Sequence, residues 1–184
     1  MKIRIIAILS LLAGSFALAS CIDDEATNEV ILANDKAAIK TYLDTTSIIN
    51  VKELHDAASG LSIIWQETAP SDTIETFYVG DSVVVNYTGK FLSDQVFETT
   101  IESVAKANDI YNSNFKYQPV KFMLGGVIYG FQYAISQMEI GEKVTVFVPS
   151  EYAYGRSSDG PGGPNTPLIF ELELLEVIPI KREP

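Results

Sequence analysis

Residues 131–148 read FQYAISQMEIGEKVTVFV, and this stretch contains two hydrophobic patterns with different periods. In its first half the apolar side chains recur at the i, i+3, i+4, i+7 spacing of one helix face, on Phe131, Ala134, Ile135 and Met138. In its second half, over residues 143–148, the side chains alternate with the period of two that is typical of a strand. The stretch therefore predicts an amphipathic helix whose apolar face covers a sheet, followed by one strand of that sheet.

Further strand candidates lie on both sides of this stretch. Residues 170–174 alternate Phe and Leu with Glu, which places the apolar side chains on one face of a strand and the carboxylates on the other. Residues 83–87 and residues 61–65 are shorter apolar runs, and the first of them ends at Thr88-Gly89. Several antiparallel strands around one helix make an α+β domain, which is the fold class that we predict.

The segment before residue 61 is less regular. We expect a short helix that begins at Asn34, because its apolar residues fall on one face, on Ala38, Ile39, Tyr42 and Leu43. Residues 50–60 are predicted to be a polar connection between this helix and the first strand. His55 lies in the connection without a neighbouring residue that would indicate catalysis, so we expect a surface histidine.

The composition excludes several classes of function. The chain has 184 residues and a formal net charge of −11, whereas binding to a nucleic-acid backbone needs clustered Lys and Arg. A hydrophobic content of 47% is too high for a disordered chain. The single Cys excludes an intramolecular disulfide, and with a single His it excludes a Cys/His zinc site. We therefore expect no nucleic-acid partner, no metal and no cofactor.

The first residues predict export. Residues 1–20 begin with Lys2 and Arg4 and continue as a nearly unbroken apolar run, which is typical of a secretory signal. The run ends Leu18-Ala19-Ser20-Cys21, which resembles a bacterial lipobox and implies lipidation of Cys21. The alternative is an ordinary signal peptide that is cut near Ala19 and leaves Cys21 as a free thiol. The lipobox implies a chain anchored by lipid at the cell envelope, in the outer membrane, on its periplasmic side or at the cell surface.

Residues 22–33 follow Cys21 and are expected to form a flexible tether, acidic at its start. The acidic group at residues 23–25 resembles the export signal of Bacteroidetes-type lipoproteins that are displayed on the cell surface. The alternative is that these carboxylates only solvate the tether.

Three stretches carry chemistry in combination: residues 83–89, residues 120–138, and residues 151–155 together with residues 164–170. In this order and spacing they resemble the FKBP-type peptidyl-prolyl cis-trans isomerases, over residues 61–178. The resemblance implies a bent antiparallel sheet wrapped around one short amphipathic helix, with a hydrophobic pocket between helix and sheet. It also implies proline-containing polypeptides as partners, and the macrolide ligands of this family as further ones.

The resemblance divides the chain into three parts. Residues 1–20 are the signal peptide, residues 21–60 hold the lipidated Cys21, the tether and the short helix, and residues 61–184 are the isomerase domain. Within that domain, residues 99–119 form an insertion, because the family generally has about half as many residues there. The insertion is either a lid over the substrate groove or a packed surface excursion.

The resemblance also implies the residues of the site. Phe131 is expected under the proline ring, while the Tyr154 hydroxyl and the Ile128 N–H are expected to donate hydrogen bonds to substrate carbonyls. The remaining implied catalytic and substrate-binding residues are Tyr87, Phe97, Glu98, Phe170, Val120 and Val127. By contrast, we interpret three further apolar residues as core only: Phe122, Phe147 and Leu172.

These features predict a prolyl isomerase that assists the folding of exported proteins at the cell envelope. The alternative is an FKBP-like chaperone or binding module with little isomerase activity. The substitutions Val120, Gly162 and Gly163 favour this alternative, because they leave less apolar surface around the pocket than the family usually has.

Overall fold

The computed structural model describes residues 24–69, 78 and 80–180. The strands within these residues are β1 (Lys52–His55), β2 (Ser62–Glu67), β3 (Ser82–Phe91), β4 (Val96–Thr99), β5 (Val120–Met123), β6 (Lys143–Val148) and β7 (Leu168–Ile178). The helices are α1 (Asp24–Thr45), α2 (Glu102–Ala107), α3 (Tyr129–Ser136) and a 3-10 turn, η1 (Ser150–Tyr152). The predicted signal peptide and Cys21 lie outside the described residues.

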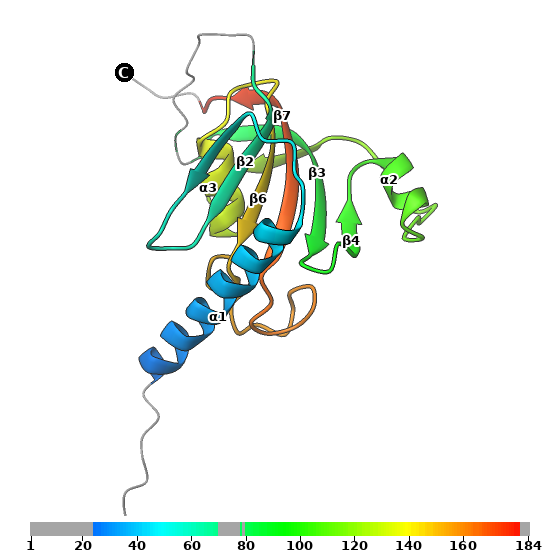
Figure 1. The fold of residues 1–184 in the computed structure, drawn as a ribbon. Helices are drawn as coiled ribbons and strands as arrows, with labels where there is room; N and C mark the ends of the chain where they lie inside the picture. Colours follow the sequence, from blue (N-terminus) through cyan, green and yellow to red (C-terminus); the bar gives the residue numbers. More distant parts are fainter. Residues whose placement is uncertain (1–23, 70–77, 79, 181–184) are drawn as a thin grey trace, which may run out of the picture.

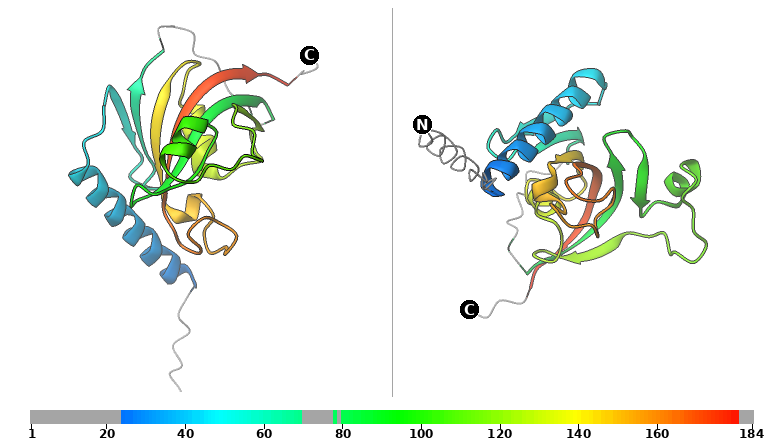
Figure 2. Two further views of the ribbon diagram at one scale, coloured as in Figure 1. Left: turned by 90° about the vertical axis from the view of Figure 1, so that its right-hand side faces the viewer. Right: turned by 90° about the horizontal axis from the view of Figure 1, so that it is seen from below.

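All strand pairs among the described residues are antiparallel, and the strands form one sheet in the order β1-β2-β6-β7-β3-β4. β5 pairs with the beginning of β3, and β4 pairs with the end of β3. The sheet curves, and α1 and α3 lie on its opposite sides (Figure 1, Figure 2). We call the side that faces α3 the inner face and the side that faces α1 the outer face. The predicted α+β class, with a bent sheet around one short helix, is confirmed.

The main core lies between α3 and the inner face. All members of the predicted helix stripe are buried, with exposed fractions of 4% for Phe131, 0% for Ala134 and Ile135, and 2% for Met138. A Cβ on Gly130 would lie 2.3 Å from the Val148 side chain, so the absence of a side chain at Gly130 lets α3 approach β6 closely. The helix therefore sits deep against the sheet, and its first turn reaches the pocket described below.

A second, smaller core lies between α1 and the outer face. Ile39 of α1 packs there with Ile64 of β2, Phe147 of β6 and Ile169 of β7. Because successive strand residues point to opposite faces, a sheet covered on both sides is apolar on both sides, which explains the continuous burial along β6. Phe147 and Leu172 are buried core residues, as predicted.

The N-terminal helix is longer than predicted. It begins at Asp24 rather than near Asn34, so the described part of the segment that we expected to be a tether is helical. The earlier part gave no helical pattern because none of residues 27–33 is buried, so no apolar stripe marks this part of α1. The Asp35 side chain accepts hydrogen bonds from the Ser150 N–H (2.7 Å) and from the Ser150 hydroxyl (2.6 Å), and both residues are buried. This contact joins α1 to η1.

Other segments also extend beyond the prediction. The expected polar connection contains β1, which pairs with β2 as a hairpin. β3 continues past Gly89 to Phe91, because β7 pairs with it along its whole length. His55 lies on β1, where it is exposed and its Nδ1 atom is 3.0 Å from the Ser62 hydroxyl.

Among the described residues, no helix has both the length and the apolar character needed to cross a bilayer.

We predict that Asp35→Ala lowers the free energy of unfolding by about 1–3 kcal/mol, because it leaves the buried Ser150 N–H and hydroxyl without their acceptor. The control is Asp44→Ala on the same helix, where the exposed Lys40–Asp44 ion pair should contribute less than about 1 kcal/mol. Urea denaturation of the two variants measures the difference. Equal destabilisation by both substitutions would contradict the structural role of Asp35.

Candidate functional site

A cavity of about 250 Å³ lies between the beginning of α3 and the inner face of the sheet. Its walls come from segments that are far apart in the sequence, and the lining residues are mostly aromatic or aliphatic. They are Tyr87, Glu98, Phe122, Gly126, Val127, Ile128, Phe131, Tyr154 and Phe170. The cavity is therefore a small apolar pocket with few polar groups.

Phe131 forms the floor of this pocket. Its ring stands edge-to-face to those of Tyr87, Phe122 and Phe170, with centroid distances of 5.8, 5.5 and 5.5 Å. Such edge-to-face pairs are favourable because the positive edge of one ring meets the negative face of another. The surrounding rings hold Phe131 in one orientation and exclude water from its sides. The pocket is consequently suited to a flat or cyclic apolar group.

The Tyr154 hydroxyl is the free hydroxyl group of the pocket. Tyr154 is 41% exposed, and its hydroxyl makes no hydrogen bond to any described residue. Burial of the ring raises the pKa of Tyr154, and the nearby Glu98 carboxylate raises this pKa further. Gly160 packs against the ring, since a Cβ there would lie 2.5 Å from Tyr154 Cγ. The hydroxyl thus remains a protonated donor at neutral pH, in a ring held by its own loop.

The Tyr87 hydroxyl is already engaged. It donates a hydrogen bond to Glu98 Oε1, which joins β3 to β4 at the rim of the pocket. Burial raises the pKa of Tyr87, and the hydrogen bond to Glu98 raises it further. Tyr87 therefore serves as a wall, whereas the Tyr154 hydroxyl is free to meet a ligand.

A second donor lies at the start of α3. Ile128 precedes the first helical residue, and its N–H makes no hydrogen bond to any described residue. The turn before it is held by Gln132, whose Oε1 atom accepts a hydrogen bond from the Gly125 N–H (2.9 Å) and whose Nε2 atom donates one to the Val127 carbonyl. Helix N-termini present free N–H groups, so the Ile128 N–H can donate to a ligand in the pocket. Gln132 is a positioning residue that the sequence analysis did not identify.

The structure brings together most of the predicted site residues but not all of them. Phe97 and Val120 do not line the cavity. The Phe97 ring lies behind Phe170, with a centroid distance of 6.0 Å, and Val120 pairs with Val85 at the far end of β5. Phe122, which was interpreted as a core residue, forms a wall instead, 5.9 Å from the Tyr87 ring. Val120 and Phe122 share one face of β5. Their alternation along the strand therefore does not tell which of them lines the pocket, and Phe122 does so because it lies against Phe131 of α3.

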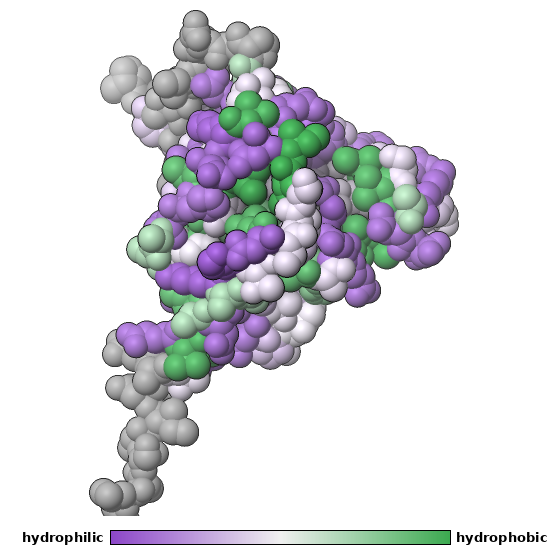
Figure 3. All heavy atoms as spheres, viewed as in Figure 1, coloured by the Kyte–Doolittle hydropathy of each residue, from purple (hydrophilic) through white to green (hydrophobic). Residues whose placement is uncertain are grey.

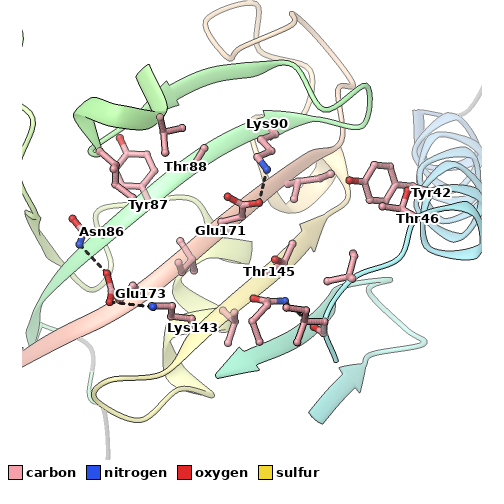
Figure 4. A pocket seen from close by; sticks show the side chains of 18 of the residues that line it. Tyr42, Thr46, Asn86, Tyr87, Thr88, Lys90, Lys143, Thr145, Glu171 and Glu173 are labelled. Atoms are coloured by element: carbon pink, nitrogen blue, oxygen red, sulfur yellow. Dashed lines mark hydrogen bonds and ion pairs between the residues drawn. The ribbon is translucent and has the colours of Figure 1, made fainter. Parts of the chain in front are cut away.

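Another cavity, of about 590 Å³, lies on the outer face (Figure 4). Its polar side chains pair with one another: Lys90 with Glu171, Lys143 with Glu67 and Glu173, and Asn86 with Glu173. The charged groups there are thus already satisfied, and we assign no binding function to this cavity.

Among the described residues, no group of three or more His, Cys, Asp or Glu side chains is placed to hold a metal ion.

Known proteins resemble this chain over the region that forms the pocket. The family model of the FKBP-type peptidyl-prolyl cis-trans isomerases matches residues 75–175. The FKBP-type isomerase FkpA of Escherichia coli K12 is 30% identical over 145 residues, which cover 79% of this chain and 44% of FkpA. The outer membrane protein MIP of Legionella longbeachae is 39% identical over 98 residues, or 53% of this chain and 36% of that protein. This chain thus spans about half of the length, or less, of these relatives.

Solved structures show the same fold. The crystal structure of FkpA from Escherichia coli aligns with a TM-score of 0.59 and 26% identity, covering 85% of this chain and 65% of that one. The peptidyl-prolyl cis-trans isomerase from Pseudomonas syringae aligns with a TM-score of 0.56 and 26% identity, covering 83% of this chain and 96% of that one. Because the family model covers more than half of the chain and includes every residue of the pocket, this chain belongs to the FKBP-type peptidyl-prolyl cis-trans isomerase family.

Proposed function

We propose that this protein catalyses cis-trans isomerisation of the bond before proline in polypeptides. The observation that carries the proposal is the ring-lined pocket above Phe131, with the free Tyr154 hydroxyl and the free Ile128 N–H at its rim. The pocket has room for a proline ring, and the two donors can meet the carbonyl groups on either side of it. Family membership supports this substrate class.

The physical task is to lower a rotation barrier. Resonance gives the amide bond partial double-bond character and a barrier of about 18–20 kcal/mol. Uncatalysed exchange at proline takes roughly 10–100 s at room temperature. The planar amide carries more charge separation than the twisted one, so an apolar environment favours the twisted state relative to the planar state. A dry aromatic pocket can therefore speed the rotation without a nucleophile or a proton carrier.

Each residue of the pocket has a role in this mechanism. Phe131 packs under the proline ring, and Phe122 and Phe170 form the walls that exclude water. The Tyr154 hydroxyl and the Ile128 N–H orient the peptide by donating to its carbonyls. The hydrogen bond between Tyr87 and Glu98 holds the Tyr87 ring in place as a further wall of the pocket. A macrolide ligand would occupy the same pocket in place of proline.

The position in the cell is a further part of the proposal. Cys21 follows a signal-like leader in a lipobox-like context, which supports a lipid anchor at the cell envelope, in the outer membrane. The similarity to a relative named as an outer membrane protein supports the same location. Substrates would then be exported polypeptides that fold close to this membrane.

We predict that Tyr154→Phe lowers kcat/KM on a short proline peptide by about two- to ten-fold. The substitution removes one neutral hydrogen bond, worth about 0.5–1.5 kcal/mol, and leaves the apolar wall in place. A protease-coupled isomerisation assay measures the effect. Tyr152→Phe is the matched control, since Tyr152 lies in the same segment outside the pocket lining and should keep the wild-type value. Wild-type activity of Tyr154→Phe would remove the hydroxyl from the mechanism.

We predict that Phe131→Ala lowers kcat/KM more than Tyr87→Phe does, because losing the floor opens the pocket to water. Loss of this buried ring also costs about 3–5 kcal/mol of stability, so circular dichroism must establish folding. Phe131→Leu, which keeps an apolar side chain, provides a milder variant. If the folded Phe131 variants retain as much activity as Tyr87→Phe, the floor assignment is wrong.

We predict that Cys21→Ala moves the protein from the membrane fraction to the soluble fraction, because it removes the proposed site of lipidation. Metabolic labelling with a fatty acid, followed by cell fractionation, makes the comparison with the wild-type chain. Membrane retention of the unlabelled variant would show that another segment holds the protein at the membrane.

A further inference from the structure

The insertion between β4 and β5 forms a small lobe beside the pocket. It contains α2 and the loop at residues 108–119, and it projects away from the sheet (Figure 1, Figure 2). Ala105 of α2 is buried, so this helix packs against the rest of the domain. The lobe is therefore a folded part of the domain.

Aromatic rings and hydrogen bonds fix the loop internally. The Tyr117 ring stacks on Tyr111, with centroids 5.4 Å apart, and meets Phe115 edge-to-face at 5.0 Å. The Tyr117 hydroxyl accepts a hydrogen bond from the Asn112 N–H (2.9 Å), and the Asn112 side chain accepts one from the Asn114 N–H (2.9 Å). These contacts hold the Phe115 ring in a defined position with respect to Tyr117.

A further cavity, of about 170 Å³, lies between this loop and β4. It is lined by Phe97, Glu98, Thr99, Ile110, Asn112, Phe115 and Tyr117. Glu98 also lines the proline pocket, and the Phe97 ring packs against Phe170 of that pocket. The cavity is thus the immediate neighbour of the proline pocket, and Glu98 lies at the boundary between them.

Four of the seven residues that line this second cavity are apolar: Phe97, Ile110, Phe115 and Tyr117. Of these, Phe115 is 43% exposed. Figure 3 shows hydrophobic residues beside hydrophilic ones on the surface of the lobe that carries α2. Exposed apolar side chains that line a cavity beside a binding pocket are available for contact with a ligand. Since small-molecule pockets usually measure about 300–1,000 Å³, this cavity fits one side chain better than an independent ligand.

We propose that the cavity at Phe115 is a specificity subsite, which binds a large apolar side chain of the same polypeptide whose proline occupies the neighbouring pocket. The inference rests on the proposed function, because continuity with the proline pocket identifies the occupant. Phe97, Phe115 and Tyr117 supply the apolar contact, and Glu98 is the one charged residue among the described residues of the lining. A phenylalanine near the proline should therefore be preferred over a serine, and a glutamate should be disfavoured.

The test measures kcat/KM of the full chain on matched proline peptides. The peptides carry Phe, Ser or Glu at each of the positions near the proline, on both sides of it. At the position that reaches the subsite, the wild-type protein should prefer Phe over Ser. In Phe115→Ala this ratio should fall by about two- to ten-fold, which is the size of one aromatic contact of about 0.5–1.5 kcal/mol.

Gln118→Ala is the control. Gln118 lies in the same loop and is exposed, but it does not line the cavity and makes none of the contacts that hold Phe115. It should keep the wild-type ratio, so a loss that occurs only in Phe115→Ala identifies the subsite rather than general disturbance of the loop. A ratio near one in the wild-type protein at every position would overturn the inference, as would an unchanged ratio in Phe115→Ala.

The same peptides separate this inference from the proposed function. If the wild-type protein isomerises none of them, the proposed function fails, and their dissociation constants are measured by titration instead. A preference for Phe in binding that is lost in Phe115→Ala would still support the subsite. Equal affinity for the Phe and Ser peptides would overturn it.

Discussion

The packing of α3 against the inner face of the sheet determines where every group of the pocket lies. Gly130 allows the helix to approach β6, and this depth brings Phe131 among the rings of β3, β5 and β7. The same helix start leaves the Ile128 N–H unpaired at the rim, because the first N–H groups of a helix have no partner within it. A helix that sat further from the sheet would leave the floor wet and move this donor away from the walls. The close packing of α3 in the core therefore also fixes the geometry of the site.

The outer face stabilises the other rim of the pocket. Asp35 of α1 accepts both hydrogen bonds from Ser150, and Arg156 donates to Asn28 on the same helix at 2.7 Å. Tyr154 lies between these two attachment points in the chain. Although α1 contacts none of the lining residues through these bonds, it holds the segment that presents the Tyr154 hydroxyl. A helix outside the proline pocket therefore contributes to the order of the pocket.

The polar groups on the outer face are paired with one another, whereas two donors on the inner face are not. This difference distinguishes the structural surface from the functional one. On the outer face the lysines and carboxylates near β7 pair with one another across neighbouring strands. On the inner face the Tyr154 hydroxyl and the Ile128 N–H have no partner among the described residues. A donor that is left unpaired next to an apolar pocket loses part of its solvation without compensation until a ligand arrives. The smaller inner pocket is for this reason the better candidate, although the outer cavity has more volume.

Local patterns in the sequence were sufficient for the elements that build the core. The apolar stripe from Phe131 to Met138 and the alternation in β6 and β7 identified the helix and the strands, because hydrophobic period and secondary structure are properties of neighbouring residues. The ordered motifs also indicated the family, and with it Phe131, Tyr154 and most of the pocket. These residues lie within segments whose local sequence is itself distinctive.

Only the tertiary structure decided the features that depend on distant partners. The buried contact that attaches α1 joins Asp35 to Ser150, which lies 115 residues away in the sequence. Phe122 rather than Val120 forms the wall because β5 is placed over α3 by its pairing with β3. Likewise, Phe97 faces a second cavity because the loop at residues 108–119 folds back beside β4. Each of these contacts joins segments that are far apart in the sequence. A hydrophobic period is a property of neighbouring residues, so it cannot predict such contacts, and only the closed sheet around α3 determines them.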